Sequence, residues 1–382
     1  ITFQARQRTP GVALKCPAGT LWDLAPFNQV EFALRNPGAA PVNVTCRVDL
    51  AWANDTRNCA KAAAELAAGA TQTVVVPFNS GAVWDANDRN SGNQLRSDEV
   101  VGLYLHGEQA ATDQVLELLS VKATIAPAPT MPAWLGTRPP VEGDWKLTFE
   151  DNFDGATIDE TKWSLPPKPE PSIWDRKSIN FADHSYVEGG CLKLKVDRLQ
   201  GFQTDDPKLQ GRTYANGFVR SLDKFAQCYG YFEARLKLPD VLGMWPAFWM
   251  MPDRGPGAQD RRTTADGGME IDIYEQLARF GPFRTNIACH WDGYGKDHKS
   301  TGCDRIYYQP DADGYVVAGL LWEPGKLTWY DNGVPAAVYA SDRVASVPGY
   351  LKFTMPTGGW GDCPVDEAKL PATFDIDWVR VW

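Results

Sequence analysis

The sequence predicts an all-β protein. Short runs of alternating apolar and polar residues recur along the chain, turn signals rich in Gly, Pro and Asp separate them, and no long segment has helical periodicity. With 382 residues the chain is too long for one average domain. We therefore expect two β-domains, 1–125 and 145–382, separated by a Pro-rich connector at 126–144.

The composition argues against two classes of function. No run of 18 apolar residues is present, so no membrane-spanning helix is predicted. The net charge of −10 comes without a basic stripe that would neutralise phosphates, so nucleic acid is not an expected partner. The aromatic residues include 15 Trp, whose flat, amphipathic side chains suit both a large β-core and the faces of sugar rings.

The first 125 residues are expected to form a small antiparallel β-sandwich. Val30, Phe32 and Leu34 alternate with polar positions, and a second alternating run follows the turn at 36–38. We find no catalytic constellation in this part. Its Trp residues either form a sugar-binding platform or belong to the core, which is the commoner use: Trp22, Trp52 and Trp84.

The connector is expected to be stiff, because its five prolines fit neither a helix nor a central strand. We expect Trp134 and Leu135 to dock it against one of the domains. From Trp145 to Trp382 short strands and turns continue, which suits one large sandwich or jelly roll. The turn at 330–333, Tyr-Asp-Asn-Gly, predicts a hairpin within it.

The stretch 267–276 carries the strongest functional signal. Alternation along a strand places Glu270 and Asp272 on one face, although neighbouring carboxylates repel each other. Glu275 would point to the other face unless a β-bulge near 273–274 turned it round. Two Glu side chains on one face could then approach the separation of about 5–5.5 Å that a retaining glycosidase uses. The alternative is a solvated acidic edge strand.

Several segments resemble glycoside hydrolase family 16, and the matches run in family order across 145–382. They are Trp145–Gly155, Asp159–Trp163, Tyr229–Pro239, Gly243–Met250, Glu270–Glu275 and Asp377–Val381. The resemblance implies a concanavalin-like jelly roll and a polysaccharide substrate. It also implies that Glu270 is the nucleophile, Asp272 its assistant and Glu275 the general acid/base, with no cofactor needed for catalysis. The first domain resembles accessory sandwich domains of polysaccharide hydrolases.

The resemblance suggests further site residues. Trp245 and Trp249 would line the cleft, and His290 would lie beside the acid/base, although a structural role is the alternative for Trp249 and His290. The other substrate-binding candidates are Trp291, Tyr294, His298, Trp174, Asn180, Trp360 and Arg262. Many members hold a structural calcium, for which Asp377 matches one ligand, whereas Asn152 stands where the family often has Glu.

We expect an endo-acting, retaining hydrolase of a laminarin-type β-1,3-glucan, with a red-algal galactan as the alternative substrate. The Trp-Pro-Ala-Phe-Trp motif at 245–249 resembles laminarinases and favours a β-1,3-glucan, as does the acidic chain. The locally basic region 254–299 favours a red-algal galactan such as agar, porphyran or carrageenan, because Arg binds sulfate well. The bulged E-x-D-x-x-E pattern occurs in both groups. A non-catalytic, lectin-like protein is the rival class.

The compartment is predicted only indirectly. The chain begins at Ile1 without a Met or a signal-like segment, which we interpret as a processed form. Cys46 with Cys59 and Cys289 with Cys303 are spaced to close loops by disulfides, and buried free thiols are the alternative. We expect a monomer that is secreted, periplasmic or on the cell surface.

Overall fold

The computed structural model describes residues 1–88, 90–172, 177–359 and 363–382, and the chain divides into two compact units. Nearly all regular structure is β, as expected, and the described helices are short 3-10 turns such as η1 (Ala182–His184), η2 (Ala278–Phe280) and η4 (Glu367–Lys369). No described helix has the length and apolar character needed to cross a membrane.

The smaller unit comprises 1–82 and 90–127. One sheet has the order β10 (Glu117–Thr124), β3 (Gln29–Arg35), β6 (Thr71–Pro77), and the other β2 (Gly11–Lys15), β8 (Gly102–Gly107), β4 (Val42–Asn54), β5 (Arg57–Leu66). Strands β1 (Thr2–Phe3) and β9 (Gln114–Val115) pair separately. The expected alternation is confirmed, because Val30, Phe32 and Leu34 are all buried.

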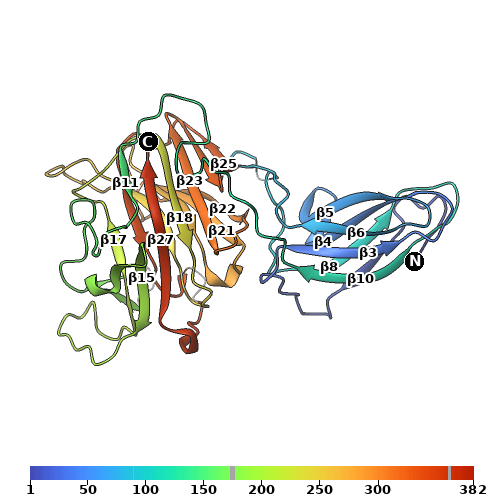
Figure 1. The fold of residues 1–382 in the computed structure, drawn as a ribbon, viewed down its shortest axis with the longest axis horizontal. Helices are drawn as coiled ribbons and strands as arrows, with labels where there is room; N and C mark the ends of the chain where they lie inside the picture. Colours follow the sequence, from blue (N-terminus) through green and yellow to red (C-terminus); the bar gives the residue numbers. More distant parts are fainter. Residues whose placement is uncertain (89, 173–176, 360–362) are drawn as a thin grey trace. The chain divides into compact units, whose positions relative to one another are not determined.

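The larger unit is built of two sheets (Figure 1). A core rich in aromatic side chains lies between them. The six-stranded sheet has the order β17 (Phe218–Arg220), β26 (Gly349–Thr354), β19 (Ala247–Pro252), β20 (Glu270–Glu275), β21 (Arg284–Trp291), β22 (Lys299–Tyr307). Buried side chains from both sheets fill the space between them, including Phe248, Ile271, Trp322, Phe353 and Phe374.

The second sheet of this unit has twelve described strands. Its main path is β12 (Glu170–Pro171), β13 (Ser178–Asn180), β16 (Tyr214–Asn216), β15 (Cys191–Arg198), β27 (Ala372–Val381), β18 (Gly230–Lys237), β23 (Tyr315–Glu323), β24 (Lys326–Asp331), β25 (Val334–Ala340), β7 (Trp84–Asp85). Strand β11 (Phe149–Asp151) pairs with β27, and β14 (Ser185–Glu188) pairs with β15. The hairpin expected at 330–333 joins β24 to β25.

Strand β7 departs from the expected division at residue 125. It comes from the first part of the chain but pairs in parallel with β25 of the larger unit, where Trp84 lies opposite Ala337. Trp84 is buried in the core of that unit and is therefore not available for a sugar-binding platform, whereas Trp52 is 91% exposed.

The connector docks as expected. Trp134 and Leu135 lie so close to Gly333 that a Cβ on this glycine would meet the Trp134 ring at 2.4 Å. In the part of the chain that the structure describes, neither Cys46 with Cys59 nor Cys289 with Cys303 forms the disulfide that was considered. The strand register explains this, because Cys46 lies opposite Ala62 and Cys289 lies opposite Thr301.

Candidate active site

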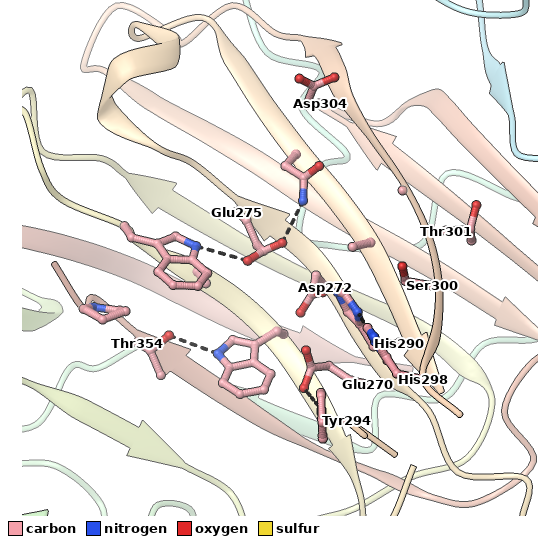
Figure 2. A pocket seen from close by; sticks show the side chains of 17 residues that line it. Glu270, Asp272, Glu275, His290, Tyr294, His298, Ser300, Thr301, Asp304 and Thr354 are labelled. Atoms are coloured by element: carbon pink, nitrogen blue, oxygen red, sulfur yellow. Dashed lines mark hydrogen bonds and ion pairs between the residues drawn. The ribbon is translucent and has the colours of Figure 1, made fainter. Parts of the chain in front are cut away.

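The three predicted acids lie along a cleft of about 570 Å³ on the six-stranded sheet (Figure 2). They come from the central strand β20, and each is at most 7% exposed. Their neighbours on the cleft wall come from β19, β21, β22, β26 and the loops beside them: Trp245, Trp249, Asn286, His290, Tyr294, His298, Ser300, Thr301, Asp304 and Thr354.

The bulge in β20 is confirmed by the register on both sides. Asp272 lies opposite Ala288 and Glu275 opposite Asn286, so three steps along β20 correspond to two along β21. The same extra residue interrupts the pairing with β19. Because side chains alternate between faces, this extra residue turns Glu275 to the face of Glu270 and Asp272.

Glu275 has the environment of a proton donor. Burial is the largest influence and raises the pKa of its carboxyl group to about 7, and the Glu270 charge acts in the same direction. Two hydrogen bonds oppose this rise: Asn286 Nδ2 donates to Oε2 at 2.8 Å, and Trp245 Nε1 donates to Oε1 at 3.1 Å. A carboxyl group poised near neutral pH suits general acid and base work.

Glu270 has partners that favour its charged form. Burial raises its pKa, whereas the hydrogen bond donated by the Tyr294 hydroxyl and the positive charge of Lys352 lower it. Asp272 differs, because burial and the charges of Glu275 and Glu270 raise its pKa well above the ordinary value. The strand thus carries one acid beside a hydrogen-bond donor and a positive charge, Glu270, and one poised near neutral pH, Glu275, a combination that suits a double displacement.

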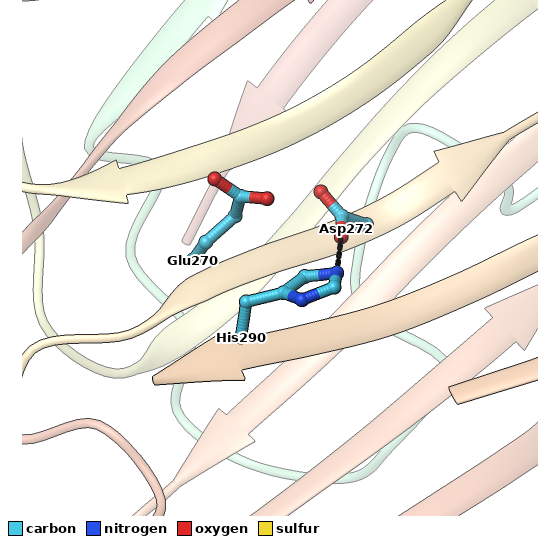
Figure 3. A group of neighbouring side chains, drawn as sticks. All are labelled: Glu270, Asp272 and His290. Carbon is cyan, nitrogen blue, oxygen red and sulfur yellow. Dashed lines mark ion pairs between the residues drawn. The ribbon is translucent and has the colours of Figure 1, made fainter. Parts of the chain in front are cut away.

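His290 joins the acids from the neighbouring strand (Figure 3). Its Nε2 lies 3.6 Å from Asp272 Oδ2, and its Nδ1 lies 2.9 Å from Nε2 of His298, whose ring stacks on it. Burial lowers the pKa of His290 to about 4, so the imidazole is neutral at physiological pH. Asp272 therefore faces a polar but uncharged neighbour.

The structure separates the other candidates. Trp245, Trp249, His290, Tyr294 and His298 line the cleft. Trp291 packs against Tyr339, and Asn180, on β13, accepts a hydrogen bond from Asn216; neither is among the residues of the cleft wall. Arg262 is exposed and its guanidinium reaches Tyr350. Trp174 and Trp360 lie outside the described residues.

Sequence reasoning missed Asn286, Lys352 and Thr354. Asn286 and His290 share a face of one strand, four residues apart, so alternation along β21 could have found Asn286. Lys352 and Thr354 lie on β26, where Thr354 accepts a hydrogen bond from Trp249 Nε1 at 3.0 Å. Nothing in their local sequence points to a site, since their position depends on the pairing of β26 with β19.

The residues expected to hold calcium do not fit a metal. Asp377 Oδ2 accepts a hydrogen bond from Arg235 Nη1 at 2.6 Å, and Asn152 Oδ1 accepts one from Arg380 Nη2 at 2.7 Å. Two guanidinium groups thus take the positive role that calcium would have beside these oxygens. We derive no function from a metal at this position.

Three arginines of the basic region 254–299 serve the fold. Arg254 donates to the backbone carbonyls of Thr263 and Ala265, and Arg261 pairs with Asp253. Arg284 is fully buried. The cation that acts on Glu270 is instead Lys352, and the charges of Arg220 and Arg262 lower the pKa of Lys352 in turn.

Comparison with known proteins agrees with this geometry. A family model described as "Beta-porphyranase A-D, GH16 domain" matches residues 145–382. Beta-porphyranase E of Zobellia galactanivorans is 30% identical over 256 residues, which cover 61% of this chain and 85% of that protein. Glucan endo-1,3-beta-glucosidase A1 of Niallia circulans is 28% identical over 275 residues, which cover 64% of this chain and 39% of that protein.

The fold is shared with a solved laminarinase. The catalytic domain of an endo-1,3-beta-glucanase from Thermotoga petrophila RKU-1 aligns with a TM-score of 0.50 at 24% identity, covering 62% of this chain and 97% of that one. Several relatives are much longer proteins, and the chain spans less than half the length of the Niallia circulans enzyme. The match of the family model over the whole region of the three acids shows that the chain belongs to glycoside hydrolase family 16.

Proposed function

We propose that the chain is an endo-acting, retaining glycoside hydrolase that cleaves internal β-linkages of a polysaccharide. The observation that carries this proposal is the trio of buried carboxyl groups on one face of β20, with Glu275 poised near pH 7 and Glu270 beside positive charge. The names of the relatives, which include endo-glucanases and porphyranases, support the same reaction class.

The reaction would run as a double displacement. Glu270 attacks the anomeric carbon while Glu275 gives its proton to the leaving glycosidic oxygen, which breaks the C–O bond and forms a glycosyl ester with Glu270. Glu275, now a carboxylate, removes a proton from water, and the water oxygen displaces Glu270 from the anomeric carbon. The negative charge of Glu270 raises the pKa of Glu275 and so favours its protonated form between turnovers, while Asp272, whose own pKa is raised well above its ordinary value, lies between them on the same face.

Isosteric substitutions test the roles of the acids. Glu270→Gln and Glu275→Gln should each lower kcat by at least about a hundredfold, because each removes a group that the reaction uses directly. Glu233→Gln is the matched control, because Glu233 is also buried with a pKa of about 7 but lies on β18, away from the three acids. The activity of this variant should equal that of the wild type. Full activity in either cleft variant would refute the proposal, and polysaccharide binding without hydrolysis by the wild type would favour the lectin-like class.

For the substrate we propose a sulfated galactan. Lys352 acts as a positive charge on Glu270, and Arg220 and Arg262 lie near enough to Lys352 to lower its pKa; such a group of cations suits an anionic sugar better than a neutral one. The family model described for porphyranases supports this choice. A laminarin-type β-1,3-glucan, favoured by the motif at 245–249, is the second candidate because a relative named as such a glucanase matches the chain.

A substrate panel separates the two candidates. Purified protein would be incubated with porphyran, carrageenan, agarose, laminarin and mixed-linkage glucan, and the products sized; internal cleavage gives a ladder of oligosaccharides. We expect hydrolysis of a sulfated galactan, with kcat/KM reduced about tenfold or more in Arg262→Ala and unchanged in Arg279→Ala, an exposed arginine on η2 that lies over Phe280. Preferential hydrolysis of laminarin would reject the galactan.

A further inference from the structure

A buried lysine packs against Trp249 of the cleft wall, and the double displacement described above gives it no role. Lys352 is 9% exposed and sits in the middle of β26. Burying a lysine amine costs free energy unless its charge has a partner, since desolvation disfavours the ammonium form. Burial is also the largest influence on Lys352 and lowers its pKa to about 7, so the charge is carried below that pH.

The strand register places Lys352 in one row with Asp272. Trp249 on β19 lies opposite Lys352 on one side and opposite Asp272 on the other. Arg220 on β17 lies opposite Lys352 in turn. Side chains that are directly opposite each other on neighbouring strands share a face, so all four point to the cleft side of the sheet.

Lys352 contacts the indole that lines the cleft. Its Nζ lies 3.3 Å from the ring centroid of Trp249, while Trp249 Nε1 donates to Thr354 Oγ1 at 3.0 Å. A cation over an indole face is an attractive contact, and it is stronger where water is excluded. The ammonium group and the Thr354 hydroxyl, two residues apart on β26, therefore fix both the plane and the rotation of the ring.

The charged groups around the nucleophile come from several elements. Asp272 and Glu275 follow Glu270 on β20, Tyr294 donates its hydroxyl from the loop after β21, and Lys352 faces it from β26. The charges of Glu270 and Asp272 raise the pKa of Lys352, whereas those of Arg220 and Arg262 lower it. Lys352 is the positive charge that lowers the pKa of Glu270.

We propose that Lys352 is a positioning residue of the proposed reaction, which holds the Trp249 indole in the cleft floor and supplies the positive charge that keeps Glu270 ready to attack. The inference rests on the proposed function for its effect on rate. Its effect on the charge of Glu270 and on Trp249 does not depend on which sugar is bound, or on whether one is cleaved.

Three substitutions separate the two parts of the role. Lys352→Met removes the charge and keeps the length, Lys352→Arg keeps a charge, and Thr354→Val removes only the anchor of the indole nitrogen. In Lys352→Met we expect the acidic limb of the kcat/KM profile to move about one pH unit higher, because loss of a nearby cation raises the pKa of Glu270. At pH values below this limb, the rate of Lys352→Met should be about tenfold lower than that of the wild type for each unit of the shift. Lys352→Arg should keep the limb of the wild type, and Thr354→Val should lower activity without moving it.

A second measurement does not require hydrolysis. Titration of ¹³C-labelled Glu side chains by NMR, with Glu270→Gln used to assign the signal, should show the Glu270 carboxyl group titrating at higher pH in Lys352→Met and in Lys352→Gln. An unchanged Glu270 titration in a folded Lys352 variant would overturn the inference. If the wild type hydrolyses none of the polysaccharides, the proposed function fails, but the NMR shift still decides the electrostatic role of Lys352.

Discussion

Glu275 receives two hydrogen bonds that act against the effect of its burial. Burial raises the pKa of Glu275 to about 7, and the bond from Asn286 at 2.8 Å favours the charged form and limits this rise. Removing the donor should therefore raise the pKa further. The group that must carry a proton in the first step would then stay protonated at higher pH.

The substitution Asn286→Ala tests this balance. We expect the alkaline limb of the kcat/KM profile to move to higher pH by about half a unit to one unit. The measurement is the rate on a soluble polysaccharide across pH 4–10. Ser300→Ala, also on the cleft wall, is the control and should leave the limb in place. A limb that moves to lower pH in Asn286→Ala would contradict the assignment of Glu275 as the acid.

At the scale of elements, the connector is held by a buried carboxyl group on β18. Glu233 Oε2 accepts from the backbone N–H of Gly136 at 3.0 Å, and Oε1 accepts from the Tyr231 hydroxyl at 3.0 Å. Arg380 Nη1 donates to the carbonyl of Gly136 at 2.5 Å. These bonds tie the connector to β18 and β27, so this part of the connector is a docked segment of the larger unit.

The stability of this contact should depend on pH. Burial raises the pKa of Glu233 to about 7 from 4.5, so the folded state binds the proton more tightly than the unfolded state. The contribution of the Glu233 carboxyl group to the free energy of unfolding is therefore complete below about pH 4.5 and is lost as pH rises through 7. The shift corresponds to about 3 kcal/mol of unfolding free energy.

Glu233→Gln, which cannot ionise, should be more stable than the wild type at pH 8 and similar at pH 4.5. Urea unfolding at both values measures this, and a difference that does not grow with pH would contradict it.

Local alternation predicted the elements that carry an apolar stripe, and it failed where the strand lacks one. The bulged strand at 270–275 was predicted because its acids and isoleucines alternate. Strand β22 shows no such pattern, since it contains Gly and charges without alternation, and β25, which contains a proline, is indicated only by the hairpin turn at 330–333. The role proposed for Lys352 on β26 depends on the pairing with Trp249, which local sequence does not encode.

At the scale of the whole molecule, the larger unit extends beyond the region that matches the family model. The match begins at residue 145, yet Trp84 is 6% exposed within the core of this unit. The backbone N–H of Ala86 donates to the carbonyl of Val338 at 3.0 Å, and Asn87 Nδ2 donates to the carbonyl of Ala340 at 3.2 Å. Strand β7 thus covers the edge of β25, which would otherwise be an open sheet edge.

The position of Trp84 leads to a prediction about both a variant and a fragment. Truncating a buried Trp to Ala costs about 3–5 kcal/mol, so Trp84→Ala should lower the stability of the larger unit by that amount. The matched control is Trp52→Ala, since Trp52 is 91% exposed and its loss should change stability by less than about 0.5 kcal/mol.

A fragment of residues 128–382 lacks β7 altogether and should unfold at a lower urea concentration than the full chain. It should also have a greater tendency to associate through the uncovered edge of β25. Urea unfolding followed by Trp fluorescence, together with size-exclusion chromatography of the fragment, checks both outcomes. Equal stability of the fragment and the full chain would mean that β7 is an accessory to the sheet, and the division of the chain would then follow the family match at residue 145.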